Sequence, residues 1–226
     1  MTPYSAVISP DRTLADLATA HASASRVFHR HGLDFCCHGR VRLDEACRDR
    51  GLDLDALLSE LQTELDRAPE GPRLDQMPIP MLIEHVLEQY HAAHRAELPR
   101  LLEMARKVEK VHGDKSSCPR GLAAHLEFVA GELEAHMQKE EQVLFPLFTS
   151  SRRQMAGMPV QVMEMEHEDH GRNLARLREL AHGYQPPAEA CNTWRALYLG
   201  LEQLERDVMQ HIHIENNILF PRALRE

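Results

Sequence analysis

The sequence predicts an all-α protein, an up-and-down four-helix bundle with a small N-terminal helical domain. Leu, Ala, Glu, Met and His are plentiful, whereas aromatic residues make up only 5% of the chain and β-branched runs are scarce, which favours helices over sheets. Four long stretches keep a helical spacing of apolar residues, and short loops rich in Gly and Pro separate them. The 226 residues are also enough to bury a sizeable core.

The composition excludes several classes of partner. The net charge is -9 and Lys and Arg form no cluster, so we expect neither nucleic acid nor an anionic membrane surface as a partner. The chain shows no basic segment followed by an apolar run at its start and no run of about 18 apolar residues, so we expect no signal peptide and no membrane span. The five cysteines are odd in number and irregularly spaced, which indicates a reducing compartment and predicts a cytoplasmic protein.

Residues 1–74 are expected to form the small helical di-cysteine domain with its linker. Residues 68–80 hold four prolines and a glycine among polar residues, which predicts a linker with the domain boundary near residue 75. Three helices are predicted here. The first runs from the N-cap Thr13 through about Arg30 and is closed by Gly32. The second runs from Leu43 to Arg50 and ends at Gly51, and the third runs from Leu54 to Leu65 and is capped by Asp53.

Residues 75–226 are expected to form the four-helix bundle. Short loops between long helices favour antiparallel neighbours. Pro99 should kink the first helix or split it, because proline lacks a backbone N–H and clashes with the preceding turn. The expected helices cover about 80–112, 120–148, 159–182 and 187–219.

One pattern occurs twice, near the ends of the second and fourth long helices. In each copy a histidine is followed by a glutamate at i+4, which places both side chains on one helix face where they can bind the same ion. A single pair of this kind is more often a surface ion pair, but the repetition with the same Phe-Pro sequence behind it favours metal ligands. The copies are His136, Glu140, Phe145 and Pro146, and His211, Glu215, Phe220 and Pro221.

Two further histidines fall at the same depth of the bundle. His85 and His167 lie early in the first and third helices, whereas His136 and His211 lie late in the second and fourth. In an up-and-down bundle these positions share one end, and at ~1.5 Å per residue all four imidazoles lie within roughly 7 to 15 Å of it. With the two glutamates they make a set of four nitrogen and two oxygen ligands.

This ligand set is suited to two metal ions. Carboxylates can bridge two cations while imidazoles complete each ion, and iron is the favoured metal because structural zinc sites are usually rich in Cys and magnesium and calcium avoid imidazole. Manganese stays an alternative to iron, because the types of ligand alone do not exclude it. Two imidazoles per ion and two shared carboxylates leave positions open for a small ligand.

Other histidines are expected to have different roles. His94 and His213 should point away from the site into solvent, whereas His170, three residues after His167, could support a ligand or serve as a fifth imidazole. The residue pattern leaves Tyr90 and His91 open. Core positions are expected for Leu144, Phe145, Trp194, Leu219 and Phe220.

The segments HMQKEEQVLFP, MEHEDHG and HIHIENNILFPRAL resemble the hemerythrin-like di-iron proteins of the iron-sulfur cluster repair (RIC) type, and LDFCCHG at residues 33–39 resembles their N-terminal di-cysteine domain. Oxygen-carrying hemerythrins use a fifth histidine one turn after the third-helix ligand and an aspartate in the last motif. Gly171 and Glu215 depart from that pattern and agree with the repair type. The resemblance implies two iron ions bridged by the glutamates beside an oxo or hydroxo group. The implied ligands are His85, His136, Glu140, His167, His211 and Glu215.

Cys36 and Cys37 are open to two interpretations. Adjacent cysteines in such a protein can simply be small residues, and a disulfide between neighbours is strained. The resemblance favours a functional pair that receives iron, binds nitric oxide or passes electrons. A weaker alternative is a small zinc or iron site that includes the nearby His29, His31 and His38.

The resemblance implies a cytoplasmic protein that repairs iron-sulfur clusters damaged by nitrosative or oxidative stress, by iron donation, nitric oxide handling or both. The expected partners are nitric oxide or dioxygen as small ligands and damaged iron-sulfur proteins, for a monomer or homodimer. An alternative is a di-iron protein that binds nitric oxide, as a sink or a sensor, or that reduces it, which would make it an enzyme. A third hypothesis is a structural bundle with incidental histidines.

Overall fold

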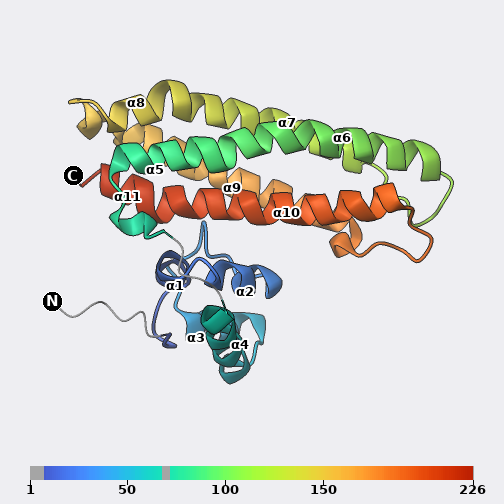
Figure 1. The fold of residues 1–226 in the computed structure, drawn as a ribbon, viewed down its shortest axis with the longest axis horizontal. Coiled ribbons are helices and arrows are strands. Elements are labelled where there is room, and N and C mark those ends of the chain that lie inside the picture. The colour runs from blue at the N-terminus through green and yellow to red at the C-terminus, as the bar shows by residue number, and fades with distance from the viewer. Residues whose placement is uncertain (1–7, 68–71, 226) are drawn as a thin grey trace. The chain divides into compact units, whose positions relative to one another are not determined.

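The computed structural model describes residues 8–67 and 72–225 (Figure 1). Within these ranges helices carry the fold and no strand forms, although Thr13 and Arg42 make an isolated antiparallel bridge. The all-α prediction is confirmed. No described helix combines the length and the apolar character needed to cross a bilayer.

Contacts between backbones divide the chain into two compact units. The first unit comprises the described parts of Met1–Leu82 together with Met209–Glu226, and the second unit comprises Ile83–Val208. The predicted domains, 1–74 and 75–226, divide the chain differently because they keep the last residues with the bundle. Those sequence domains stay a prediction.

Short capped helices build the N-terminal part of the first unit. The Thr13 hydroxyl accepts a hydrogen bond from the Asp16 amide at 3.1 Å, as an N-cap does. The expected single helix through Arg30 is wrong: the chain forms two helices, and the Ser25 hydroxyl donates to the Ala22 carbonyl at 2.6 Å at the break, where it competes with helical bonding. The helices are α1 (Leu14–Ala20), α2 (Ala24–Arg30), α3 (Leu43–Arg50), α4 (Leu54–Arg67) and the 3-10 turn η1 (Leu74–Gln76).

The predicted end signals of α3 and α4 are confirmed. Gly51 takes a left-handed conformation with φ 65° directly after α3, which glycine adopts without the steric cost of a Cβ. The Asp53 carboxylate accepts from the Ala56 amide at 3.1 Å at the start of α4. Local sequence therefore fixes both boundaries.

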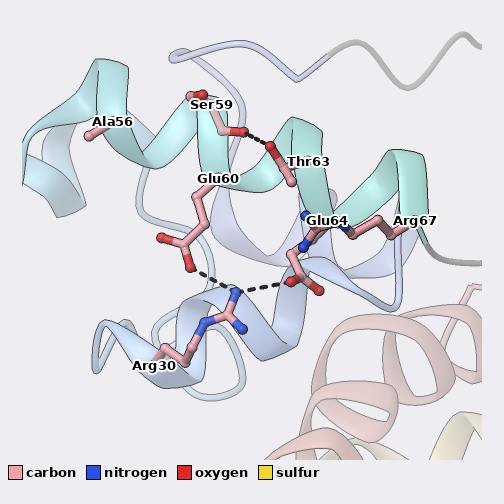
Figure 2. Close-up of a pocket in the computed structure, with 7 residues that line it drawn as sticks. All are labelled: Arg30, Ala56, Ser59, Glu60, Thr63, Glu64 and Arg67. Atoms are coloured by element: carbon pink, nitrogen blue, oxygen red, sulfur yellow. Dashed lines mark hydrogen bonds and ion pairs between the residues drawn. The ribbon is translucent and has the colours of Figure 1, made fainter.

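Helices α2 and α4 face each other across ion pairs that surround a shallow surface pocket (Figure 2). Arg30 lies 2.7 Å from Glu60 and 3.4 Å from Glu64. These partly exposed pairs contribute little to stability, because solvent screens them. Phe28 of α2 and Leu57 of α4 are buried, and their burial stabilises this part of the unit.

The four predicted long helices are present, but each of three contains a π-helical segment. In order along the chain the segments are α5 (Ile79–Val86), the π-segment η2 (Leu87–His91), α6 (Ala92–His112), α7 (Leu122–Lys139), the π-segment η3 (Glu140–Leu144), α8 (Phe145–Phe148), the 3-10 turn η4 (Arg153–Ala156), α9 (Gly157–Leu180), the 3-10 turn η5 (His182–Tyr184), α10 (Asn192–Ile214), the π-segment η6 (Glu215–Leu219) and α11 (Phe220–Ala223).

The second unit is a closed four-helix bundle. Helix α6 packs on α7, and α7 packs on α9. Arg178 of α9 pairs with Glu205 of α10 at 3.0 Å, and a Cβ added to Gly200 of α10 would lie 2.5 Å from Leu101 of α6. Each helix thus contacts two others, and the up-and-down four-helix bundle is confirmed. The residues expected in the core, Leu144, Phe145, Trp194, Leu219 and Phe220, are all buried.

Pro99 does not split its helix. Helix α6 continues through Pro99 from Ala92 to His112. The first long helix is interrupted earlier, at η2, where the π-turn inserts an extra residue. The expected split at Pro99 is therefore wrong, whereas a kink there stays a prediction, and the interruption falls at a position that proline chemistry does not mark.

Candidate metal centre

A cluster of imidazoles and a carboxylate lies inside the second unit. The Nε2 atoms of His136 and His167 are 3.0 Å apart, and Glu140 Oε1 lies 3.4 Å from His136 Nε2. His91 approaches from η2, with its Nε2 3.4 Å from the other Glu140 oxygen, Oε2. These four side chains are at most 1% exposed.

The geometry of this cluster fits a metal ion. Two imidazole nitrogens bound at right angles to one ion, each at about 2.1 Å, lie about 3.0 Å apart. The two Nε2 atoms of His136 and His167 have this separation. Each Glu140 oxygen faces a different histidine, which is the arrangement of a carboxylate that contacts two ions.

A carboxylate orients His136 from behind. Glu166 Oε2 accepts from His136 Nδ1 at 2.9 Å, and Glu166 Oε1 pairs with Lys139 at 2.5 Å. Burial alone would raise the pKa of Glu166, but Lys139 and His136 outweigh it and the net pKa is lowered. Because the anionic Glu166 holds the proton of His136 on Nδ1, the Nε2 lone pair points toward the site.

His91 is oriented in the same way. Its Nδ1 donates to Glu141 at 2.7 Å, Arg95 pairs with the same Glu141 oxygen at 2.7 Å, and the ring stacks on Phe145 with centroids 5.9 Å apart. Burial would raise the pKa of Glu141, whereas Arg95 and His91 lower it further than burial raises it. Both imidazoles are thus fixed in the tautomer that a metal requires.

The structure does not bring His85 to this cluster. His85 is half-buried with its ring 5.9 Å from that of Tyr90, and no group of three or more possible ligand atoms among the described residues includes it. His91 lies six residues further on, which is ~9 Å along a helix. Depth in the bundle did not distinguish these two histidines, and no sequence pattern marks the π-turn that places His91.

The first unit contains the second His-Glu pair. His211 Nε2 lies 3.2 Å from Glu215 Oε1, and both side chains are at most 1% exposed. Glu215 begins the π-segment η6, as Glu140 begins η3. The i, i+4 pairing expected from the sequence is thus formed in each unit.

Two histidines differ from their expected environment. His94 and His213 were expected in solvent, but they are 1% and 0% exposed, so this expectation is wrong. For His170 the sequence left two roles open, support of a ligand or a fifth imidazole. Its ring lies edge-on to that of His136, with the ring centroids 4.8 Å apart. It therefore borders the cluster of the second unit.

The di-cysteine loop lies in the first unit and both thiols are free. The carbonyl of Phe35 accepts from His213 Nδ1 at 3.2 Å, and the carbonyl of Cys36 accepts from Asn217 Nδ2 at 3.0 Å. Burial lowers the pKa of His213 to about 4, so the ring is neutral at neutral pH. The loop is thereby attached to the π-turn that starts at Glu215.

The nearby histidines are arranged unequally around the cysteine pair. His38 Nδ1 lies 2.7 Å from Asp34 Oδ2, and Asp34 in turn contacts the pair. His31 Nε2 instead lies 2.7 Å from Glu60 Oε2 on α4. Cys37 and burial raise the pKa of Cys36 well above its usual range.

Comparison with known proteins gives two separate family matches along the chain. Residues 82–223 match the hemerythrin HHE cation binding domain, and residues 10–65 match the ScdA_N domain of unknown function. The chain is similar to the iron-sulfur cluster repair protein YtfE of Yersinia pseudotuberculosis serotype O:1b (strain IP 31758), with 47% identity over 95% of this chain and 97% of the relative. YtfE of Yersinia pestis (strain Pestoides F) is similar to the same extent. The chain therefore belongs to the hemerythrin HHE cation-binding family and to the YtfE family of iron-sulfur cluster repair proteins.

Proposed function

We propose that the chain is a di-iron protein that repairs iron-sulfur clusters damaged by nitrosative or oxidative stress. The observation that carries the proposal is the buried His-Glu cluster, whose imidazoles are oriented by charged side chains, in a chain similar over nearly its whole length to repair proteins. Free cysteines throughout the chain agree with a reducing compartment, and we assign the function to the cytoplasm.

The proposed ligand set takes His91 in place of His85. His91 supplies a buried nitrogen beside Glu140, whereas His85 contacts Tyr90. We infer that His211, near the end of α10, and Glu215, at the start of η6, complete the set. Helix α10 is one continuous helix from Asn192 to Ile214, and the match to the cation-binding domain spans both units. The proposed ligands are His91, His136, Glu140, His167, His211 and Glu215.

The side chains of the protein have distinct proposed roles at this centre. Glu140 and Glu215 would bridge the two ions and offset part of their charge, and the four imidazoles would complete them. Glu141 and Glu166 hold the ring orientation of His91 and His136. Iron, when bound, supplies redox chemistry and open positions for a small ligand. Phe145, stacked on His91, excludes water from that side of the cluster.

The repair function is tested with a dehydratase whose iron-sulfur cluster has been damaged by nitric oxide. The iron-loaded full chain is expected to restore the activity of the dehydratase under anaerobic conditions, and the iron-poor His91→Ala variant is not. If free ferrous iron at the same iron concentration restored the dehydratase activity to the same extent, a role for the protein would be contradicted.

Direct nitric oxide chemistry is the second candidate function, and the ligand count favours it. Six ligands, two of them shared, leave coordination positions open on both ions. If the protein, kept reduced by an added electron donor, consumes nitric oxide beyond its own stoichiometry and releases nitrous oxide and water, the chain is a nitric oxide reductase. A single stoichiometric uptake would instead indicate a sink or a sensor.

Cys36 and Cys37 are proposed to take part in this function. Their loop is hydrogen-bonded to Asn217, two residues after Glu215. Replacing both cysteines by serine is expected to lower repair while the iron content stays the same. Unchanged repair would separate the cysteine pair from the function.

A further inference from the structure

The di-cysteine loop contains a second cluster of possible ligands, outside the proposed di-iron set. One atom each of Asp34, Cys36 and Cys37 lies within 4.8 Å of the other two. All three belong to one loop of the first unit, between α2 and α3. The cluster combines two sulfur atoms with one carboxylate, a donor set that thiophilic divalent cations prefer.

The separation of the two sulfurs suits a single ion. The two Sγ atoms are 3.9 Å apart. Two thiolates bound to one tetrahedral ion, each at about 2.3 Å, lie about 3.8 Å apart. One ion can therefore bind both sulfurs with little movement of the loop.

Asp34 is placed to provide the third ligand. Its Oδ1 lies 3.2 Å from Cys36 Sγ and also accepts the backbone amides of Cys36 and Cys37 at 3.1 and 3.0 Å. Its other oxygen lies 2.7 Å from His38 Nδ1. Burial would raise the pKa of Asp34, but His38 and these donors outweigh it and the net pKa is lowered, so the group is an anion. Thus His38 orients a carboxylate that is already directed at the sulfurs.

Hydrogen bonds anchor the loop on one side, and Cys37 is accessible on another. The carbonyl groups of Phe35 and Cys36 are bound by His213 and Asn217. Cys36 is buried, whereas Cys37 is half-buried and gives access from solvent. An anchored loop with one accessible ligand provides a cation site with an entry path.

We propose that Asp34, Cys36 and Cys37 form a mononuclear site for a thiophilic divalent cation, with His38 as the residue that positions Asp34. The fourth coordination position is left to solvent or to a donor from a client protein. This site extends the proposed function. The assignment of ferrous iron in transit as its physiological cation rests on the proposed repair function, whereas the capacity to bind a thiophilic cation does not.

The test is a titration of the reduced, iron-loaded full chain with Cd²⁺. Binding is measured by the thiolate-to-metal charge-transfer absorption in the ultraviolet. Nitrogen and oxygen ligands do not produce this absorption, so the di-iron set is silent in the measurement. The absorption is expected to saturate at about one equivalent per chain. The His91→Ala substitution, which lowers the iron content, should leave this absorption intact, and this separates failure of the cysteine site from failure of the proposed di-iron function.

Two variants and one control locate the site. Cys37→Ser changes a half-buried residue and should remove most of the absorption. Asp34→Asn keeps an oxygen for the two backbone amides but loses the charge, and should weaken binding about tenfold or more. The matched control is Cys191→Ser, which removes an exposed thiol from the second unit and should change nothing.

The proposal is overturned if the reduced chain shows no thiolate-to-metal absorption. It is also overturned if the absorption persists unchanged in both Cys37→Ser and Asp34→Asn, or if Cys191→Ser removes it. Far-ultraviolet circular dichroism and iron content, measured on each variant, identify any substitution that fails to fold.

Discussion

His91 and His136 each donate one ring proton to a glutamate whose own charge is fixed by Arg95 or Lys139. These outer contacts matter as much as the ligands themselves, because they set the tautomer and the ring direction before any metal arrives. Two ion pairs on the surface of the bundle thereby prepare a site in its interior.

Substitution of His91 is compared with substitution of His85. His91→Ala removes a buried nitrogen next to Glu140 and is expected to lower the iron content by about half, since a di-iron centre loses the ion it cannot complete. His85→Ala should keep the iron content of the original chain. Metal analysis of both anaerobically purified variants decides between them, and the reverse order would restore His85 to the ligand set.

The orienting role of Glu166 is tested by Glu166→Gln. The amide oxygen still accepts from His136, but the charge that Lys139 balances is lost, and metal affinity should fall about 10- to 100-fold. Competition with a chelator measures the affinity. Glu164→Gln, two residues earlier on α9, is the matched control. An equal effect of both substitutions would contradict a specific role for Glu166.

Asp207 offers a test of stability against pH. Burial raises its pKa in the fold, and Glu97 raises it further, although Gln203 and Arg206 act in the opposite direction. A carboxyl group with a raised pKa contributes stability below its unfolded pKa of about 3.9 and loses it as the pH rises through the folded pKa.

Asp207→Asn should therefore raise the free energy of unfolding at pH 7, by less than about 1 kcal/mol because the group is half-buried. The gain should vanish well below pH 4. Denaturant unfolding at the two pH values provides the measurement. A loss of stability at pH 7 would show that the carboxylate is favourable where it lies.

Pairs of residues that lie on one helix face were predictable from the sequence. The i, i+4 spacing predicted His136 with Glu140 and His211 with Glu215, and both pairs form. The residue spacing did not identify His91 as a ligand, because the direction of side chains around a π-turn differs from that in a regular helix. Nor could it locate Glu166 and Glu141 as partners, since these contacts join residues 30 and 50 positions apart.

Among the helices, three of the six proposed ligands lie in π-segments. His91 ends η2, Glu140 begins η3 and Glu215 begins η6. A π-turn widens the helix by one residue and changes the direction of the side chains around it, so it can aim a ligand inward at the expense of regular hydrogen bonding. Helix ends, in contrast, followed local signals such as Thr13, Gly51 and Asp53, which made them predictable.

The di-cysteine loop depends on a close approach at Gly39. A Cβ at this position would lie 2.3 Å from the Phe35 carbonyl oxygen and 2.8 Å from Ala15, and neither atom is the end of a flexible side chain. Gly39→Ala should destabilise the first unit by about 1–3 kcal/mol and disturb the cysteine pair. Thermal unfolding and the reactivity of the Cys37 thiol report these two effects.

Gly131→Ala is the matched control, because a Cβ on this exposed position of α7 meets nothing within 4 Å. That substitution should stabilise the chain by about 0.5–1 kcal/mol through helix propensity. If Gly39→Ala were equally well tolerated, the loop would have to be more adaptable than its contacts indicate.

In the whole molecule, one chain combines a match to the hemerythrin HHE cation binding domain at residues 82–223 with a match to the ScdA_N domain at residues 10–65. Breaker-rich loops and helical periodicity were enough to predict the bundle, because long amphipathic helices with short connections have few ways to pack. The compact units could not be predicted in the same way. The last residues of the chain belong with the first unit through contacts such as that between Asn217 and Cys36, which no local signal announces.

The six His and Glu side chains are proposed to hold two iron ions. Metal analysis of the full chain, purified without oxygen, tests this proposal most directly. About two irons per chain are expected in the original sequence, with a clear loss of iron in His91→Ala. Absence of iron, or a single zinc ion at full occupancy, would contradict this proposal.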